Sequence, residues 1–386
     1  MKKKEVDNLI LEKLLGSGSF GVVFLASVKG DESKKLAAKR IERTEIEGTK
    51  LMDYFRNEIE ILQRLDHPNI VKFHSIKKTK KFFYLAMEFC NGGGLDEALE
   101  KYQEKYGKPF SEEIVQYLMR QIIDAFKYIH SQRVIHRDIK LENILINFET
   151  EKDKEELNMM KATVKIVDFG FACFISKTGS LYSTVGSPIN MDPVILKKKN
   201  DDSKKARQLA YDQKADIWSL GTICYEMLIG KSAFDANDMD ELVEKIEDGT
   251  YTIPTSLSSE VVSFINGMLQ YDSQKRLSSD ELIKHPFLTK EVKDFHPIDL
   301  KKVSKKVGDE GLEINTKKNK SIWAIFNATD EKKLLGINRK NALRDQDLEV
   351  IFEDLILPEE GIPGNPIEKG NEEDPKENED EDKKED

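Results

Sequence analysis

The first 90 residues combine short apolar runs with one amphipathic stretch. The runs GVVFLASV (21–28), KLAAKRI (35–41) and FFYLAMEF (82–89) have the length and the β-branched or aromatic content of strands. Between them, residues 52–65 repeat apolar side chains every three or four positions, which predicts a helix with one buried face. We therefore expect residues 1–90 to form a small sheet with one main helix packed on it.

From residue 91 to residue 288 the helical period dominates. Apolar residues recur at helical spacing in 112–130, 215–230 and 258–270. A lobe built mainly of helices should therefore follow the sheet. Together the two patterns predict an α+β fold with two lobes.

Four polar or thinly apolar stretches lie outside this pattern. The stretches near 148–162 and 197–208 lack a period that would bury a face, so we expect surface insertions there. Residues 289–357 keep apolar clusters sufficient for a helix or two docked on the body, and their role is unassigned. Residues 358–386 are acidic and rich in Gly, Pro and Asn, which predicts a disordered tail.

The net charge of −10 is concentrated near the end of the chain. Residues 345–386 sum to −14, residues 289–344 to +6 and residues 1–288 to −2. This distribution argues against a nucleic-acid-binding protein, because the predicted folded part lacks a basic surface. The acidic tail is either an arm that binds a protein partner or a solvated segment that keeps the protein soluble.

Cysteine usage and hydropathy bear on the compartment. The cysteines are three in number and far apart (Cys90, Cys173 and Cys224), which fits no disulfide framework and indicates a reducing compartment such as the cytoplasm. The apolar stretch near the start is broken by Glu12 and Lys13, unlike a signal peptide. No later stretch approaches membrane-spanning length, so no membrane association is expected.

A glycine-rich turn marks the first candidate site. Gly16, Gly18 and Gly21 lie in LLGSGSFGVVF, where glycines would let backbone N–H groups approach phosphate oxygens. Because a strand rather than a helix follows Gly21, the pattern favours a strand-turn-strand flap over a nucleotide and disfavours a dinucleotide-binding turn.

A charged residue interrupts the strand that follows the flap. Lys39 in KLAAKRI is a candidate cation for the α and β phosphates, and it needs a carboxylate to hold it. Glu58 and Glu60 lie on the predicted helix about 200° apart around its axis, so both cannot point inward. We favour Glu58, with Glu60 as the competing candidate.

The stretch HRDIKLEN (136–143) and the tripeptide DFG (168–170) carry the strongest signal. They resemble the catalytic loop and the metal-binding motif of the eukaryotic protein kinases, and several motifs follow in the order of that family over about 280 residues. The resemblance implies the bilobal kinase fold. A lysine at position 140 of this loop is similar to the Ser/Thr class rather than to the tyrosine class. The segments MEFCNGGGL, DFGFA and VGSPINMDP look most like the autophagy-initiating kinase group.

The resemblance implies a role for each motif residue. Asp138 would accept the proton of the attacking hydroxyl, and Lys140 would lie by the γ-phosphate. Asn143 and Asp168 would bind Mg²⁺ through hard oxygen ligands, and the ion would bridge the phosphates of ATP, the co-substrate.

Other residues correspond to the adenine pocket and the apolar spine of the family. The resemblance implies that adenine lies against Val23, Ala37 and Leu145, and that residues 87–90 form the hinge, with Met87, Glu88 and Cys90 contributing to ATP binding. His136 and Phe169 would pack in the spine with Leu62 and Phe73 rather than react.

The family pattern also implies control by the segment after Asp168. Asp216 would hold the catalytic loop, and Arg137 would pair with a phosphate on Ser183 or Thr184.

The pattern breaks at one buried ion pair. The family's Ala-Pro-Glu reads Asp192-Pro193-Val194, so the usual glutamate partner of Arg276 is missing. Either Asp192 or another carboxylate replaces it, or Arg276 turns to solvent. The second departure is Gly94, at a position where kinases that prefer basic substrates often carry an acid, although Glu142 is present.

These observations predict a Ser/Thr protein kinase that transfers the γ-phosphoryl group of ATP to protein hydroxyls. The alternative is a pseudokinase, a nucleotide-binding scaffold with weak or no catalysis, which the Val194 replacement favours.

Overall fold

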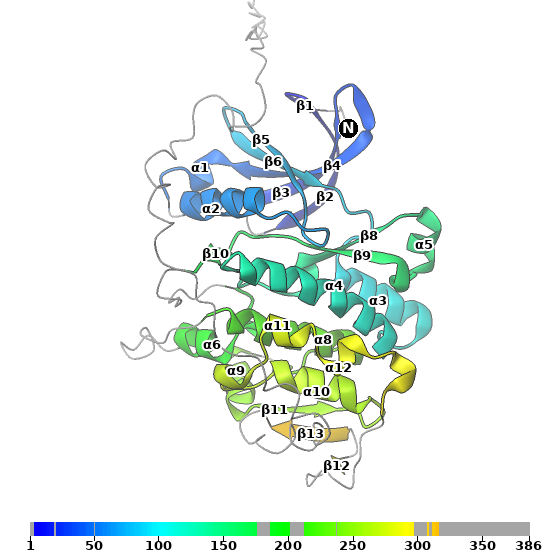
Figure 1. Ribbon diagram of the computed structural model, residues 1–386. Coiled ribbons are helices and arrows are strands. Elements are labelled where there is room, and N and C mark those ends of the chain that lie inside the picture. Colours follow the sequence, from blue (N-terminus) through cyan, green and yellow to red (C-terminus); the bar gives the residue numbers. More distant parts are fainter. Residues whose placement is uncertain are drawn as a thin grey trace, which may run out of the picture. The chain divides into compact units, whose positions relative to one another are not determined.

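The computed structural model describes residues 4–18, 21–49, 51–175, 186–200, 212–236, 238–296, 307–308 and 311–315 of the 386-residue chain (Figure 1). Its first part is an antiparallel sheet in the strand order β1-β2-β3-β4-β6-β5. The strands are β1 (Lys4–Val6), β2 (Leu9–Gly18), β3 (Gly21–Val28), β4 (Asp31–Glu42), β5 (Phe73–Lys78) and β6 (Phe82–Glu88).

Helix α2 (Leu51–Arg64) packs on this sheet, preceded by the short α1 (Arg43–Ile46) (Figure 1). The predicted apolar face is buried, with Phe55, Ile59 and Leu62 in the core. The rings of Phe55 and Phe83 of β6 lie 5.1 Å apart between centroids, so the helix is fixed against the sheet by aromatic packing.

The second part is mainly helical. Its helices are α3 (Leu95–Tyr106), α4 (Glu112–Ser131), α5 (Glu151–Glu156), α6 (Pro193–Asn200), α8 (Lys214–Ile229), α9 (Met239–Asp248), α10 (Ser259–Met268), α11 (Ser279–Leu282) and α12 (Pro286–Thr289). Helix α8 is buried along almost its whole length and packs against α4 and α10. The predicted α+β fold with a sheet-bearing lobe and a helical lobe is confirmed.

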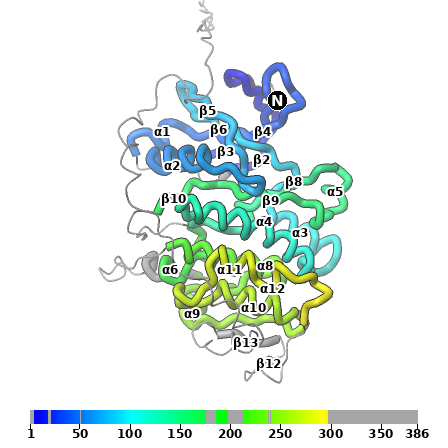
Figure 2. The backbone as a smooth tube through the Cα atoms, viewed as in Figure 1, coloured from blue at the N-terminus to red at the C-terminus, as the bar shows by residue number. Residues whose placement is uncertain are grey.

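Short strands connect the helices where the candidate site lies. They are β7 (Val134–Ile135), β8 (Ile144–Phe148), β9 (Ala162–Ile166) and β10 (Cys173–Phe174), paired as β8 with β9 and β7 with β10. The 3₁₀ turn η1 (Leu141–Asn143) precedes β8. Figure 2 shows the β8–β9 hairpin between the sheet and α4.

The two polar stretches predicted as insertions differ in structure. Helix α5 has no buried residue, whereas Met159, in the 3₁₀ turn η2 (Met159–Lys161), is buried. In the second stretch, residues 197–200 continue α6, and residues 201–208 lie outside the described residues.

After α12 the chain forms a 3₁₀ turn, η5 (Val292–Asp294), and then strands β12 (Val307–Gly308) and β13 (Gly311–Asn315). Strand β13 pairs with β11 (Thr250–Ile253) of the helical lobe. The apolar clusters in which docked helices were expected lie outside the described residues, as does the acidic tail. None of the described helices is both long enough and apolar enough to cross a bilayer.

Candidate active site

Lys39 joins the sheet to the segment that follows β9. Its Nζ lies 2.9 Å from Glu58 Oε1 on α2 and 3.3 Å from Asp168 Oδ1. Lys39 and Glu58 are buried, and the Asp168 side chain is 36% exposed. Two residues 129 positions apart in the chain are therefore brought together.

Lys39 and Asp168 stabilise each other's charged forms, whereas burial raises the pKa of Glu58. Burial alone would lower the pKa of Lys39, but the carboxylates of Glu58 and Asp168 outweigh it and raise that pKa above its usual range. Burial would raise the pKa of Asp168, but Lys39 outweighs it and lowers that pKa. At neutral pH the site therefore presents an ammonium beside an ionised carboxylate.

The competing carboxylate points elsewhere. Glu60 pairs with Arg64 one turn along α2, at 2.5 Å between Oε1 and Nη2, and both side chains are substantially exposed. Of the two candidates, Glu58 is the one that faces Lys39.

The glycine flap is the turn between β2 and β3. The register pairs Gly18 with Gly21 and Gly16 with Val23. A Cβ on Gly16 would meet no atom within 4 Å, which leaves its backbone open to a ligand. Glycine is needed at position 21 for a different reason. Its φ is +138°, and a Cβ on Gly21 would lie 2.2 Å from the Arg40 carbonyl oxygen. The close contact with β4 therefore requires glycine at position 21, independently of the expected approach to phosphate.

The face of the sheet that carries Lys39 also carries the expected adenine contacts. Lys39 lies opposite Val23 on β3, and Ala37, two residues earlier, lies opposite Met87 on β6. Directly opposed residues and residues two apart share one face, so these four line the same surface. Leu145 forms a β-bridge with Gly94, four residues beyond the hinge.

The hinge, residues 87–90, begins within the last two residues of β6. Glu88 is held by Lys165, at 2.8 Å between Oε1 and Nζ. Among the described residues, none accepts a hydrogen bond from the backbone N–H of Cys90. Burial raises the pKa of the Cys90 thiol to about 12, so the thiol stays neutral. The backbone N–H of Cys90 is therefore available to a nitrogen of the base.

Asp138 lies in the loop between β7 and η1. Its Oδ2 accepts a hydrogen bond of 3.0 Å from Asn143 Nδ2, and Lys140 Nζ lies 3.8 Å from the same oxygen. Asp138, Lys140 and Asn143 thus lie together, with Asp138 6% exposed.

Ser187 is a site residue that sequence reasoning missed. Its backbone N–H and its hydroxyl both donate to Asp138 Oδ1, at 2.8 and 2.7 Å. The sequence signal for it was the preceding residue, Gly186. In the structure Gly186 has φ +112°, and a Cβ there would lie 2.2 Å from the Arg137 carbonyl oxygen. Such a close approach requires glycine and places Ser187 against the catalytic loop.

Asn143 and Asp168 fit a magnesium site. Asn143 Nδ2 donates to the backbone oxygen and to the carboxylate of Asp138, which leaves the amide oxygen as the group available to a cation. Asn143 and Asp168 are held at neighbouring strand ends, because Val167 N–H donates to the Asn143 carbonyl at 3.0 Å. An amide oxygen and an ionised carboxylate are the hard ligands that Mg²⁺ takes beside substrate phosphates.

Asp216 and His136 fix the position of the catalytic loop through hydrogen bonds. Asp216 accepts hydrogen bonds of 3.0 Å from the backbone N–H groups of His136 and Arg137. The His136 ring is fully buried, lies 4.9 Å from the Phe169 ring between centroids, and bonds the Val167 carbonyl at 3.0 Å. The geometry agrees with packing of His136 and Phe169 in a spine.

The missing glutamate partner of Arg276 is replaced by Asp192. Arg276 Nη1 bonds Asp192 Oδ2, and both side chains are buried. The guanidinium also donates to the carbonyls of Gln270 and Lys214, at 2.7 and 2.8 Å, and lies 5.1 Å from the Trp218 ring. Of the three alternatives left open, the structure adopts the first. The expected phosphorylation positions Ser183 and Thr184 lie outside the described residues.

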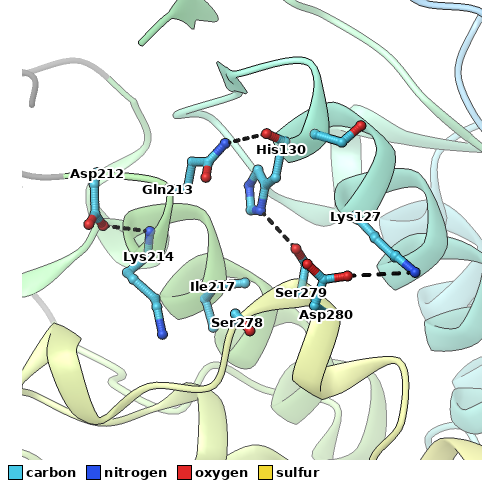
Figure 3. A pocket seen from close by; sticks show the side chains of 10 residues that line it. Lys127, His130, Asp212, Gln213, Lys214, Ile217, Ser278, Ser279 and Asp280 are labelled. Atoms are coloured by element: carbon cyan, nitrogen blue, oxygen red, sulfur yellow. Dashed lines mark hydrogen bonds and ion pairs between the residues drawn. The ribbon is translucent and has the colours of Figure 1, made fainter. Parts of the chain in front are cut away.

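A pocket of roughly 240 Å³ has neither Lys39 nor Asp168 in its lining (Figure 3). It is lined by α4, α8 and α11, and His130 in its wall bonds Ser279 Oγ at 3.3 Å and Asp216 Oδ2 at 3.0 Å. The pocket is therefore joined to the catalytic loop through Asp216.

Comparison with known proteins agrees with this geometry. The profile of the protein kinase domain family matches residues 9–288. The Ser/Thr-protein kinase atg1 of Dictyostelium discoideum is 31% identical over 289 residues, which cover 74% of this chain and 40% of that protein. Human Ser/Thr-protein kinase ULK1 is 33% identical over 278 residues, which cover 71% of this chain and 25% of that protein.

The Ser/Thr-protein kinase PLK4 of Drosophila grimshawi is 28% identical over 286 residues, which cover 74% of this chain and 34% of that protein. The matched region thus spans less than half the length of each of these relatives. The atg1 and ULK1 matches confirm the expected resemblance to the Ser/Thr class and the autophagy-initiating group. The chain belongs to the protein kinase family, with its kinase domain in residues 9–288.

Proposed function

We propose that this chain is an active Ser/Thr protein kinase that transfers the γ-phosphoryl group of ATP to a Ser or Thr hydroxyl of a protein substrate. The observation that carries the proposal is the three-part contact of Lys39 with Glu58 and Asp168, which assembles a phosphate-binding cation and a metal-binding carboxylate between the sheet and the catalytic loop.

Each side chain has one task in the transfer. Asp138 accepts the hydroxyl proton and aims the oxygen at the γ-phosphorus, while a new O–P bond forms, the bond to the β-phosphate oxygen breaks and ADP leaves. Lys39 binds the α and β phosphates and Lys140 the γ-phosphate. Asn143 and Asp168 hold Mg²⁺, which neutralises charge on the phosphates when bound.

ATP lies between the glycine flap and the hinge. Its adenine packs against Val23, Ala37 and Leu145, with Met87 at the back. Backbone groups of Glu88 and Cys90 form hydrogen bonds with the base. The N–H groups around Gly16, Gly18 and Gly21 cover the phosphates.

Phosphorylation of Ser183 or Thr184 controls the segment after Asp168, with Arg137 as the cationic partner. A mass spectrum of active protein without phosphate on either residue would remove this part of the proposal.

The pseudokinase alternative rests on Val194. Its force is reduced by Asp192, which supplies the carboxylate that the buried Arg276 requires.

The three cysteines form no disulfide, which supports a reducing compartment, the cytoplasm. The acidic tail is the part of the chain most suited to a protein partner.

Catalysis is tested by incubating the purified full chain with labelled MgATP and a generic basic protein, beside Asp138→Ala. We expect transfer that is lost in Asp138→Ala and abolished by a chelator of divalent cations. Equal transfer in both proteins would indicate a contaminating kinase. No transfer by either, with labelled ATP still bound, would establish the pseudokinase.

A further inference from the structure

The last described strand of the chain lies beside a strand of the kinase domain. Strand β13 pairs antiparallel with β11 over four residue pairs, from Thr250 opposite Asn315 to Ile253 opposite Leu312 (Figure 1). The kinase domain ends at residue 288, so β13 comes from outside the family's domain.

Strand β11 is anchored firmly to the helical lobe. Its residues Tyr251 and Ile253 are buried. The Tyr225 hydroxyl of α8 donates to the Thr252 carbonyl at 2.6 Å, and the Tyr251 hydroxyl donates to Asn266 Oδ1 of α10 at 2.7 Å. Because both neighbouring helices hold it, β11 presents a fixed backbone edge.

The sequence of β13 suits that edge. Residues 311–315 read GLEIN, an alternation of apolar and polar residues typical of a strand with one buried face. The register sets Leu312 opposite Ile253 and Ile314 opposite Tyr251, the two buried residues of β11. Apolar residues of the two strands are therefore in phase.

The second edge of β13 is also paired. Strand β12 lies on the far side, with Val307 opposite Leu312 and Gly308 opposite Gly311. The hairpin as a whole thus adds two strands to β11, in the order β11-β13-β12. An unpaired strand edge presents free N–H and C=O groups, and adding a strand satisfies them while side-chain alternation selects the sequence.

We propose that the edge of β11 is a docking site for an extended peptide with alternating apolar and polar residues, and that residues 311–315 are its resident occupant. The folded body then includes this strand beyond the family's domain. The site binds the same segment when it is supplied as a separate peptide, because backbone pairing and register do not require a covalent link.

Hydrogen exchange of the unaltered full chain is the first test. Amides within 311–315 should exchange at least roughly tenfold more slowly than the same sequence does in an unstructured peptide. Exchange of 311–315 at the rate of an unstructured peptide would overturn the proposal without any variant.

The second test replaces residues 311–315 by Gly-Ser-Gly-Ser-Gly, which keeps the chain length. The matched control carries the same replacement at 316–320. We expect faster exchange of the β11 amides in the first variant only, with protection restored by a synthetic peptide of residues 305–317 and not by a scrambled one. Unchanged exchange of the β11 amides in the first variant would overturn the proposal. Equal restoration of their protection by the synthetic peptide and by the scrambled one would also overturn it.

Discussion

The carboxylate of Asp192 pairs with the guanidinium of Arg276, and both side chains are almost completely excluded from solvent. Asp192 stands two positions before Val194, which occupies the place where the family carries its glutamate. Its other oxygen accepts the Val194 N–H at 2.7 Å, at the start of α6. One side chain therefore neutralises a buried cation and caps a helix.

Replacing Asp192 should be costly because Arg276 would remain buried without a carboxylate. We expect Asp192→Asn, which keeps a capping oxygen but loses the charge, to lower the free energy of unfolding by about 3 to 5 kcal/mol. Chemical denaturation of the full chain measures this.

The double variant Asp192→Asn with Val194→Glu restores a carboxylate at the family's usual position and should recover part of the loss. A single variant as stable as the unaltered protein would mean that carbonyl contacts alone satisfy Arg276.

The roles of two glutamates on one helix can be separated. Glu58→Gln removes the charge that holds Lys39, so Lys39 should shift toward Asp168 and bind phosphates poorly. We expect kcat/KM for ATP to fall roughly 10- to 100-fold, equivalent to about 1.4 to 2.7 kcal/mol.

Glu60→Gln is the matched control, because Glu60 pairs with Arg64 of the same helix, whose side chain is exposed. It should leave kcat/KM within about twofold. Equal losses in the two variants would contradict the assignment of Glu58.

Ser187 should matter for turnover rather than for ATP binding. Ser187→Ala removes the hydroxyl that donates to Asp138 Oδ1 and leaves the backbone N–H of residue 187 on that oxygen, so the carboxylate is held less firmly. We expect kcat to fall roughly tenfold or more, with little change in KM for ATP. Ser187→Thr keeps a hydroxyl and should retain most of the rate; a rate as low as that of the alanine variant would contradict the role of this hydrogen bond.

Glu226 should make stability fall as pH rises. Burial, and then the charges of Glu142 and Asp96, raise its pKa from 4.5 to about 7. The folded protein therefore holds this proton more tightly than the unfolded chain. The resulting stabilisation is complete below pH 4.5 and is lost as pH rises through 7.

Glu226→Gln cannot ionise, so relative to the unaltered protein it should gain about 2 to 3 kcal/mol between pH 4 and pH 8. Urea unfolding of both proteins across this range measures the difference. Parallel stability curves would show that Glu226 does not carry this dependence.

Much of the site could be predicted from sequence because its residues are set by local backbone geometry. Asp138, Lys140 and Asn143 lie within six positions of one another, and the loop and the turn η1 between β7 and β8 bring them together. Helical period placed Glu58 and Glu60 on different faces, but packing of α2 on the sheet decided which face meets Lys39.

Sequence reasoning left one long-range partner undecided and missed another. Asp192 was one of three alternatives for Arg276, 84 positions away, and Ser187, 49 positions from Asp138, was not foreseen. Which polar groups meet across such separations depends on how helices and loops pack, which no local pattern encodes. The pairing of β13 with β11 is of the same kind.

By itself, the sequence determined the two lobes, the order of the motifs and the chemical groups of the site, because periodicity and short motifs act over a few residues. Only the tertiary structure decided which carboxylate holds Arg276, which hydroxyl holds Asp138 and which strand covers β11. Those choices minimise unpaired polar groups in a buried interior, and burial is a property of the whole fold.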